Sequence, residues 1–327
     1  MSNTENTAQI TASYGRRFSV RTLSGCLYEA NTRGKRVDFA CGDWVRITPL
    51  NREQAVIEEL LPRQSLLYRQ DAYRSKLIAA NVSLLVVVTA AVPAPSEMLL
   101  QRALLAAEAA DIRVLIAVNK SDLPQSAAWL EKLAFYQTLG YPLLPLCALE
   151  GADALKPLLA GETAILLGQS GMGKSTITNA LLGDDRARTA DISTALDSGK
   201  HTTTHAQLYD LDEETQLIDS PGLQEFGLHH LAPEKLPCYF PDLHPLMGQC
   251  RFHNCTHRAE PGCAVKAAAE KGEIHWERLA LLQKITDEHK LAAAQALAAL
   301  VDEPTADYVI PSPFDERVVE AVAKVIR

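Results

Sequence analysis

This sequence of 327 residues has no apolar run long enough to cross a lipid bilayer. The longest run covers about 84–92 and is interrupted by Thr89, whereas a spanning helix needs roughly 20 residues. The first residues, MSNTENTAQITAS, are polar and lack a basic start followed by an apolar segment, so we expect no signal peptide. Long low-complexity segments and internal repeats are also missing. These absences favour a globular, cytoplasmic protein with no membrane partner.

Cysteines are few and odd in number. The chain has seven, and without a secretory signal a disulfide framework is not expected. In a reducing compartment, clustered cysteines more often hold a metal. Three of the seven, Cys26, Cys41 and Cys238, lie apart from the others, and we expect them to be buried or incidental.

The net charge of −8 gives no general support for a nucleic-acid partner. The charge is uneven, however, because residues 1–75 carry +3 and the remainder −11. This asymmetry is compatible with a local RNA contact, although ordinary surface variation explains it equally well. An RNA contact would use limited basic patches such as Arg16, Arg17, Arg33, Lys35 and Arg36.

Short alternating segments separated by turn residues fill the first 75 residues, for example 17–21, 37–40 and 43–47. Such spacing predicts a small sandwich or barrel. The pattern then changes to buried strands, the continuous apolar run 84–88 and the segment 113–118, that alternate with helical segments. This alternation predicts an α/β domain with a mostly parallel sheet.

The pattern changes again near Pro237, where a loop dense in Cys and His begins. Helix is expected over 265–299, with an interruption near Gly272, and again over 315–326. We therefore predict three domains, with residues 1–75, 76–236 and 237–327.

A phosphate-binding loop is indicated by the sequence GQSGMGKS, which fits G-x-x-x-x-G-K-[ST] without a mismatch. It follows a predicted strand and opens a predicted helix, as the motif requires. Glycines let backbone N–H groups surround a phosphate, the Lys reaches the β- and γ-phosphates, and the Ser hydroxyl binds Mg²⁺. The nucleotide-binding candidates here are Gly168, Gln169, Ser170, Gly171, Met172, Gly173, Lys174, Ser175 and Thr176.

A base-recognition motif, N-K-x-D, directly follows the predicted strand 113–118 and comprises Asn119, Lys120, Ser121 and Asp122. The Asp carboxylate accepts from two guanine donors that adenine lacks, and such polar mismatches discriminate strongly. Alone the tetrapeptide also fits a helix cap, but beside a phosphate loop it favours GTP. It precedes the phosphate loop, the reverse of the usual order, so a circularly permuted GTPase domain is the natural inference.

Two further segments suit Mg²⁺ and the γ-phosphate. Asp219 to Gly222 match D-x-x-G after a predicted strand, so that Asp219 would hold Mg²⁺ through water and the Gly222 N–H would sense the γ-phosphate. Upstream, GKHTTT is a candidate switch loop in which Thr203 supplies a hydroxyl to Mg²⁺. A β-prone stretch is the alternative interpretation of this Thr run.

The residue after D-x-x-G is Leu223, where many GTPases have a Gln that orients the attacking water. Gln224 lies one position later. We therefore expect slow unaided hydrolysis, with His201 or a partner helping to place the water.

A zinc site is predicted by the spacing C-x4-C-x-H-x5-C. Three thiolates and one imidazole make a closed tetrahedral set, which fits one structural zinc ion better than a catalytic one. His253 is a competing ligand in place of His257. The predicted ligands are Cys250, Cys255, His257 and Cys263.

Taken together, the barrel-like start, the permuted order NKSD, GQSGMGKST, GKHTTT and DSPG, and the late Cys/His cluster resemble the RsgA/YjeQ family of GTPases dependent on the small ribosomal subunit. The resemblance covers roughly 14–283 and implies an OB-type β-barrel, a circularly permuted P-loop GTPase domain, and a mostly helical zinc-binding domain. It also implies subunit-stimulated hydrolysis of GTP to GDP in late small-subunit maturation. In the family's Ser-Ala guanine loop this sequence has Cys147 and Ala148.

Two alternative functions remain open at this stage. One is a P-loop kinase or ATPase acting on a small molecule, which the NKSD motif disfavours. The other is a zinc and OB module that binds nucleic acid and has a vestigial nucleotide site, which the intact Lys174, Ser175 and Asp219 disfavour. The main interpretation implies GTP with Mg²⁺, small-subunit rRNA as partner, and a monomer.

Overall fold

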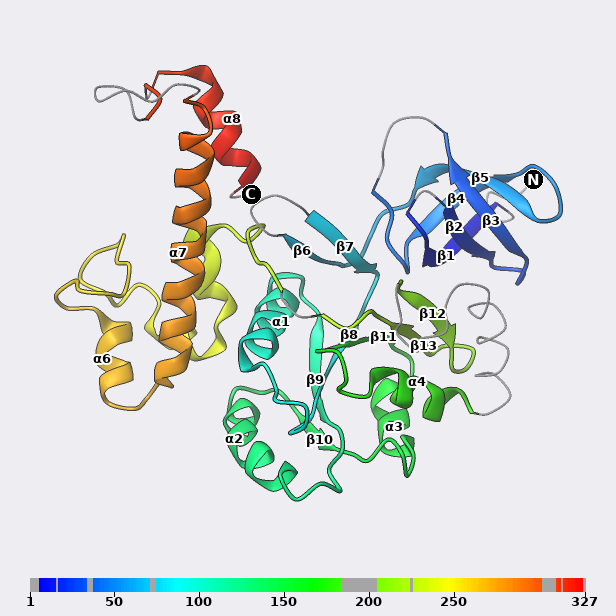
Figure 1. The fold of residues 1–327 in the computed structure, drawn as a ribbon, viewed down its shortest axis with the longest axis horizontal. Coiled ribbons are helices and arrows are strands. Elements are labelled where there is room, and N and C mark those ends of the chain that lie inside the picture. Colours follow the sequence, from blue (N-terminus) through cyan, green and yellow to red (C-terminus); the bar gives the residue numbers. More distant parts are fainter. Residues whose placement is uncertain are drawn as a thin grey trace. The chain divides into compact units, whose positions relative to one another are not determined.

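The protein is described by a computed structural model over residues 6–15, 17–33, 38–70, 75–183, 205–223, 226–301, 310–312 and 314–325. The chain forms two compact units, one from 1–68 and 77–225 and the other from 69–76 and 226–327 (Figure 1). The expected division into three domains stays a prediction.

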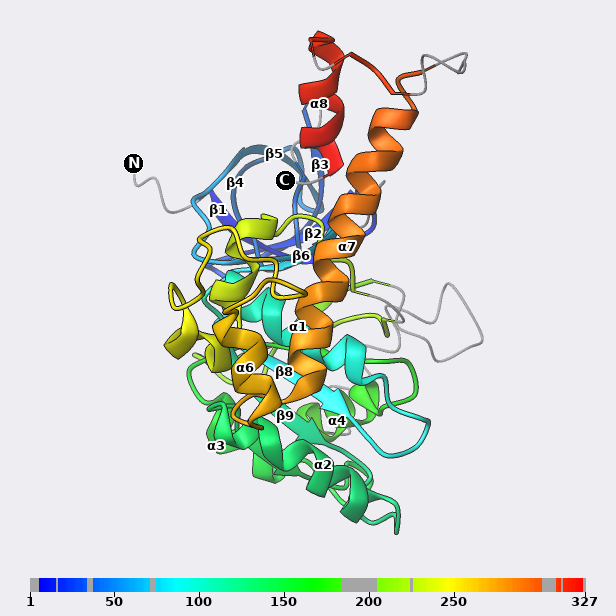
Figure 2. The same ribbon diagram turned by 90° about the vertical axis from the view of Figure 1, so that its left-hand side faces the viewer.

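A closed barrel forms the start of the first unit, because its first strand pairs with both the second and the fourth. The order around it is β1-β2-β3-β5-β4, with β3 and β5 parallel. Figure 2 shows the ring. Alternating residues such as Ile10, Val20 and Ile47 fill its interior, which confirms the predicted OB-type barrel. Its strands are β1 (Thr7–Ser13), β2 (Arg17–Thr22), β3 (Leu27–Thr32), β4 (Trp44–Pro49) and β5 (Gln54–Leu60).

The expectation of a strand over 37–40 is wrong for the described residues 38–40. Here the Ala40 N–H donates to the Asp43 carboxylate at 2.7 Å, and the Asp43 N–H donates to the Ala40 carbonyl at 3.2 Å. These local bonds make a turn instead of a ladder. Phe39 still contributes to the barrel core. The apolar pattern therefore predicted the burial of Phe39 correctly and the strand conformation of this segment incorrectly.

The sheet of the GTPase-like region has the order β10-β9-β8-β11-β13-β12. All neighbouring pairs are parallel except β12–β13, which is antiparallel. β8 is buried along its whole length, as its continuous apolar run predicts. The strands are β8 (Leu84–Thr89), β9 (Arg113–Val118), β10 (Leu143–Pro145), β11 (Thr163–Leu167), β12 (Gln207–Asp210) and β13 (Gln216–Asp219).

Helices cover this sheet, and Figure 1 shows it between α1 and α4. One face packs alternate β8 residues, including Leu84 and Val86, against Leu155 and Ile177 of the segments that follow β10 and β11. Its helices are α1 (Glu97–Ala109), α2 (Ser126–Thr138), η1 (Asp153–Leu155), α3 (Lys156–Leu159) and α4 (Lys174–Leu182).

The second unit is mainly helical in its described residues. Arg278 is 1% exposed, donates to Asp242 at 2.9 Å and lies 4.5 Å over the Phe240 ring, so it joins the long helix to the preceding 3-10 segments. None of the described helices is long and apolar enough to cross a membrane. Its helical segments are η2 (Pro233–Tyr239), η3 (Pro241–Leu246), α6 (Ala264–Glu270), α7 (Trp276–Ala298) and α8 (Glu316–Val325).

A separate two-stranded sheet is formed by β6 (Leu66–Gln70) and β7 (Ser75–Ala80).

Candidate nucleotide and metal sites

Four of the predicted nucleotide segments lie within the described residues, and each is found at or just after the end of a parallel strand. Asn119 follows β9, Cys147 comes shortly after β10, Gly168 follows β11, and Asp219 ends β13. Carboxyl ends of parallel strands meet at one edge of the sheet, where open α/β proteins bind ligands. The central strand β11 leads into the phosphate loop, with the D-x-x-G strand β13 next to it on one side and β8 on the other, and the NKSD strand β9 lies beyond β8. Although the motifs occur in a reversed order along the chain, the sheet brings them to one site.

Glycine is required at both ends of the loop 168–173. A Cβ on Gly168 would lie 2.1 Å from the Val88 carbonyl oxygen. Gly173 has φ +92°, and a Cβ there would lie 2.2 Å from Asn119 Nδ2. α4 begins at the next residue, Lys174, so the N–H groups of its first turn face the loop. This is the local geometry that holds a phosphate at a helix N-terminus.

The Lys174 side chain folds back over the loop. Its ammonium donates to the carbonyls of Gly168 at 3.0 Å and Gln169 at 3.2 Å, and the residue is 6% exposed. Burial lowers the pKa of Lys174 from its ordinary value, and the charge of Asp219 offsets part of this effect. The ammonium therefore lies at the loop that would surround the phosphates.

Asn119 ties three segments together, as expected for the first residue of the base motif. Its Nδ2 donates to the Met172 carbonyl at 2.9 Å, and its Oδ1 accepts from the Ala148 N–H at 3.0 Å. The residue is only 2% exposed, so this amide fixes the base loops against the phosphate loop.

Lys120 and Asp122 take different positions from Asn119. The Lys120 ammonium donates to the carbonyls of Val92 at 2.9 Å and Gly171 at 2.8 Å. The Cys147 thiol hydrogen-bonds to the Asp122 carboxylate, and this bond is the main cause that raises the pKa of Cys147. Lys120 thus supports the phosphate loop, while Asp122 lies beside the loop that carries Cys147.

The D-x-x-G segment packs against the phosphate loop. Ser175 Oγ lies 3.4 Å from Asp219 Oδ2, and the Leu223 N–H donates to the Gly168 carbonyl at 3.1 Å. A Cβ on Gly222 would lie 2.8 Å from Ser170 Cα. The chain after β13 therefore approaches the loop so closely that only glycine fits at position 222.

One supporting residue of the site was not predicted as such. The Gln169 side chain accepts from the Ser96 N–H at 3.0 Å and donates to the Ala94 carbonyl at 3.4 Å. It thereby joins the phosphate loop to the segment before α1, a link between distant segments that no local pattern signals. The predicted switch residues His201 and Thr203, together with Gln224 and the basic residues Arg16, Lys35 and Arg36, lie outside the described residues.

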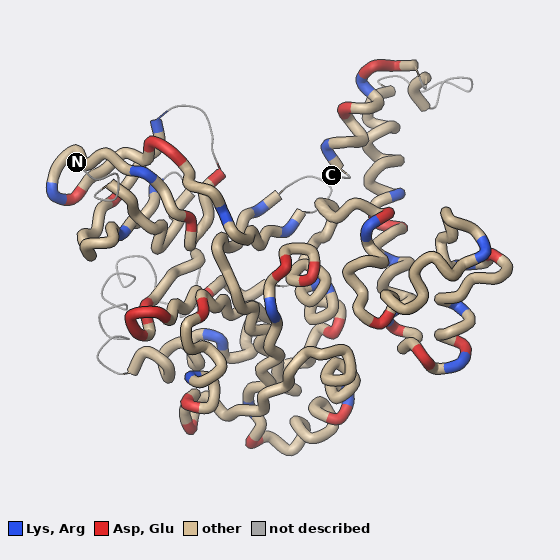
Figure 3. The backbone as a smooth tube through the Cα atoms, turned by 180° about the vertical axis from the view of Figure 1, so that it is seen from behind, with Lys and Arg blue, Asp and Glu red and all other residues tan. Residues whose placement is uncertain are grey.

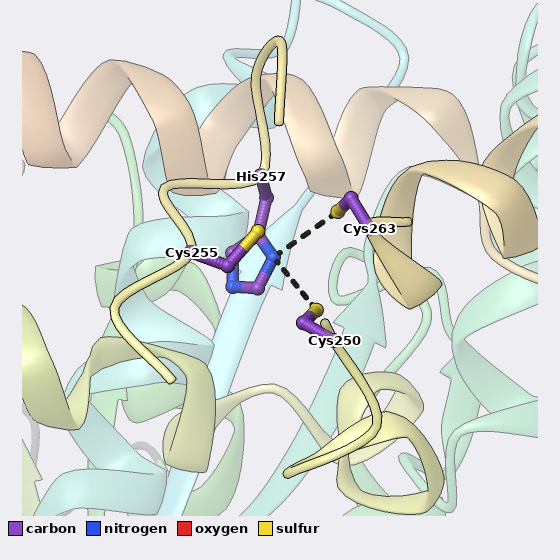
Figure 4. A group of neighbouring side chains, drawn as sticks. All are labelled: Cys250, Cys255, His257 and Cys263. Atoms are coloured by element: carbon purple, nitrogen blue, oxygen red, sulfur yellow. Dashed lines mark hydrogen bonds between the residues drawn. The ribbon is translucent and has the colours of Figure 1, made fainter. Parts of the chain in front are cut away.

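The predicted metal ligands converge in the second unit (Figure 4). The donor atoms of Cys250, Cys255, His257 and Cys263 all lie within 4.8 Å of one another. Zn–S bonds of about 2.3 Å would place tetrahedral ligand atoms roughly 3.8 Å apart, so the set is compatible with zinc. The group contains His257 and not the competing His253.

Local hydrogen bonds shape the loop that carries these ligands. The Glu260 carboxylate accepts from the Thr256 hydroxyl and from the N–H groups of Thr256 and Arg258, and these bonds lower its pKa, with the hydroxyl first. On the other side, Gln283 of α7 donates to the His257 carbonyl at 2.6 Å. This bond ties the ligand loop to the long helix at His257.

The model of the RsgA GTPase family matches residues 60–229. Curated relatives called small ribosomal subunit biogenesis GTPase RsgA include one from Neisseria gonorrhoeae strain NCCP11945. It is 72% identical over 283 residues, covering 86% of this chain and 92% of the relative. Another, from Nitrosospira multiformis, is 47% identical over 279 residues, covering 85% and 89%.

Two solved structures are similar to this chain. The crystal structure of YjeQ from Thermotoga maritima matches with a TM-score of 0.66 and 27% identity, covering 86% of this chain and 98% of that one. YloQ, described as a circularly permuted GTPase, matches with a TM-score of 0.62 and 26% identity, covering 87% and 94%. Matches of this extent agree with the permuted site described above, and the chain belongs to the RsgA GTPase family.

Proposed function

We propose that this protein is a cytoplasmic GTPase that binds the small ribosomal subunit and acts in its late maturation. The observation that carries the proposal is the convergence of three loops at one sheet edge. Asn119 bonds the base loops to the phosphate loop, and the D-x-x-G segment contacts the phosphate loop through Asp219 and Leu223. The names of the relatives supply the biological setting, since they describe small ribosomal subunit biogenesis GTPases.

Each group of residues in the site would bind a different part of GTP. Backbone N–H groups of 168–175 bind the phosphates, and Lys174 exchanges its carbonyl partners for β- and γ-phosphate oxygens. Asp122 accepts from the guanine N1–H and 2-amino groups. The adjacent hydroxyl of Ser175 and carboxylate of Asp219 fit Mg²⁺, a hard cation that prefers oxygen ligands. When bound, Mg²⁺ neutralises charge that develops on the phosphates.

Hydrolysis joins a water oxygen to the γ-phosphorus and breaks its bond to the β–γ bridging oxygen, which gives GDP and phosphate. Leu223 has no polar group with which to orient that water, and its N–H is bonded to the Gly168 carbonyl. The isolated protein would therefore turn over slowly. The small subunit would accelerate the reaction by placing a polar group near the water, with His201 as the candidate within this chain.

Zinc would have a structural role. Three thiolates and one imidazole fill all four tetrahedral positions and leave none for a substrate. Zinc would thereby fix the 250–263 loop. The barrel and this loop would serve as contacts to rRNA, with Arg17 and Arg33 among the described basic candidates of the barrel. The proposed active form is a monomer.

The deciding experiment measures steady-state GTP and ATP turnover with and without purified small subunits. We expect turnover with GTP only and a rise of at least about tenfold on adding small subunits, against no rise with large subunits. ATP turnover equal to GTP turnover would favour a general P-loop NTPase. GTP binding without any stimulation would contradict the ribosomal role.

A further inference from the structure

The barrel is joined to the GTPase sheet through the strand pair β12–β13. In the antiparallel pairing β1–β12, Ala12 lies opposite Gln207. In the pairing β12–β13, the same Gln207 lies opposite Asp219. One row of the ladder therefore runs from barrel strand β1 through β12 to the carboxylate proposed for Mg²⁺.

A second connection lies three residues along the same strands. The Arg21 guanidinium of β2 forms a two-point ion pair with the Asp210 carboxylate of β12, with Nη2 to Oδ1 at 2.7 Å. The side-chain amides of Gln9 and Gln216 bond reciprocally, each at 2.9 Å. Gln216 also donates to Asp210 at 3.1 Å. We call these four side chains the seam: Gln9, Arg21, Asp210 and Gln216.

The seam fixes the position of β12 relative to the barrel strands β1 and β2. Bidentate Arg–carboxylate pairs have a narrow geometry, and the Arg21 side chain is only 25% exposed, which limits screening by water. Gln9 is 3% exposed. A shift of β12 along β1 would break the ion pair and the amide pair together, so the barrel and β12 have to move as one.

We propose that the seam couples the nucleotide at Asp219 to the barrel, with Arg21 and Asp210 as positioning residues for β12. Asp219, the last residue of β13, contacts Ser175 of the phosphate loop. Exchange of GTP for GDP therefore changes the contacts made at the end of β13. The ladder passes that change to β12, and the seam passes it to β1 and β2. Coupling is reciprocal, so a ligand on the barrel would alter nucleotide affinity by the same path. This inference rests on the proposed function.

The test measures hydrogen–deuterium exchange of the full-length, zinc-loaded protein with GDP and with a non-hydrolysable GTP analogue. In the parent protein we expect exchange in β1 to differ by about fivefold or more between the two nucleotides. Asp210→Asn should reduce that difference to less than about twofold. Glu59→Gln is the matched control, because it also neutralises an acidic partner of an arginine, Arg46, but within the barrel. It should keep the full difference.

A double variant guards against misfolding of the single one. Arg21→Asp with Asp210→Arg reverses the ion pair and should restore the nucleotide-dependent difference in β1. The inference is overturned if Asp210→Asn keeps the parent's difference, if the double variant folds without restoring it, or if β13 responds to nucleotide while β1 does not. A failure of the proposed function looks different, since neither nucleotide would then protect the 168–175 loop, and the coupling would fall with it.

Discussion

At the scale of single residues, the site depends on contacts that leave no room for other side chains. Asn119 serves two loops with one amide, and Gly173 lets that amide approach. Both residues could be proposed as site residues from motif spacing, because phosphate and base recognition require these residue types. The partners of Lys120 and Gln169 were not predictable, since they lie on segments that only the folded chain brings close.

Gly173→Ala should abolish tight GTP binding. Its methyl group would meet Asn119 Nδ2 at 2.2 Å, and φ +92° adds strain, about 1–2 kcal/mol for an L-residue. We expect GTP affinity, measured by calorimetry, to fall more than about tenfold. Gly183→Ala is the control, because its backbone (φ +75°, ψ 165°) is also strained for an L-residue but nothing lies within 4 Å of the added methyl group. It should lower the free energy of unfolding and leave GTP affinity nearly unchanged, and equal affinity losses would contradict the explanation.

Lys174→Ala should weaken GTP binding by about 10- to 100-fold, because a charge-assisted hydrogen bond contributes about 1.5–3 kcal/mol. Nucleotide affinity and turnover are the measurements. Lys132→Ala, which removes an exposed lysine paired with Glu97, is the control and should match the parent. A Lys174→Ala variant with parental affinity would exclude phosphate binding by this side chain.

At the scale of secondary structure elements, prediction succeeded where the chain's own pattern decides the outcome. β9 and α4 begin and end as expected at 113–118 and 174–182. β9 is apolar and buried after its first residue, Arg113, and α4 is bounded by Gly173 and Gly183, both with positive φ. Local chemistry fixes such elements, so one sequence is enough to locate them.

β1 was not predicted, and the reason is physical. Its five central residues, 8–12, are all buried, yet Gln9 and Thr11 are polar. Their burial is tolerated because Thr11 donates to the Ser19 carbonyl at 3.2 Å and Gln9 bonds to Gln216. From sequence alone, a polar residue is predicted to be exposed unless its hydrogen-bond partner is known. The partner of Gln9, Gln216, lies 207 positions away in the chain.

Removal of zinc should unfold the metal loop and spare the nucleotide site. Structural zinc supplies folding energy of about 10–16 kcal/mol in small domains, and the 250–263 loop contains no helix or strand of its own. Cys255→Ser should reduce bound zinc from one ion per chain to a small fraction, measured by elemental analysis, and lower the melting temperature, while GTP affinity persists. Cys238→Ser, at an exposed thiol outside the cluster, should keep the zinc. Equal zinc contents would refute the ligand set.

At the scale of the whole molecule, charge decides how an acidic protein can approach RNA. The barrel carries both basic and acidic residues (Figure 3), and the described arginines often have acidic neighbours, such as Arg17 with Glu29 and Arg33 with Glu58. Such exposed pairs are weak, so phosphates can compete for the guanidinium groups. Because the whole chain carries a net charge of −8, we nevertheless expect few phosphate contacts and a shallow salt dependence.

Arg17→Gln combined with Arg33→Gln should reduce small-subunit affinity and the slope of log affinity against log salt by about 1–2, since each lost phosphate contact removes about 0.7–0.9. Binding at several salt concentrations is the measurement. Arg113→Gln, an exposed arginine paired with Glu162 on the GTPase sheet, is the comparison and should leave the slope unchanged. Identical slopes for both variants would place the RNA contact elsewhere.

The reciprocal amide pair has a consequence for biosynthesis, because Gln9 and Gln216 are separated by 207 positions in the chain. A translating ribosome adds about 5–20 residues per second. The first strand thus emerges about 10–40 s before the strand that completes its contacts. During that interval the side-chain amide of Gln9 lacks its Gln216 partner. A nascent chain of this protein would therefore expose its amino-terminal edge to chaperones, and to other nascent chains, until more than half of its length has been made.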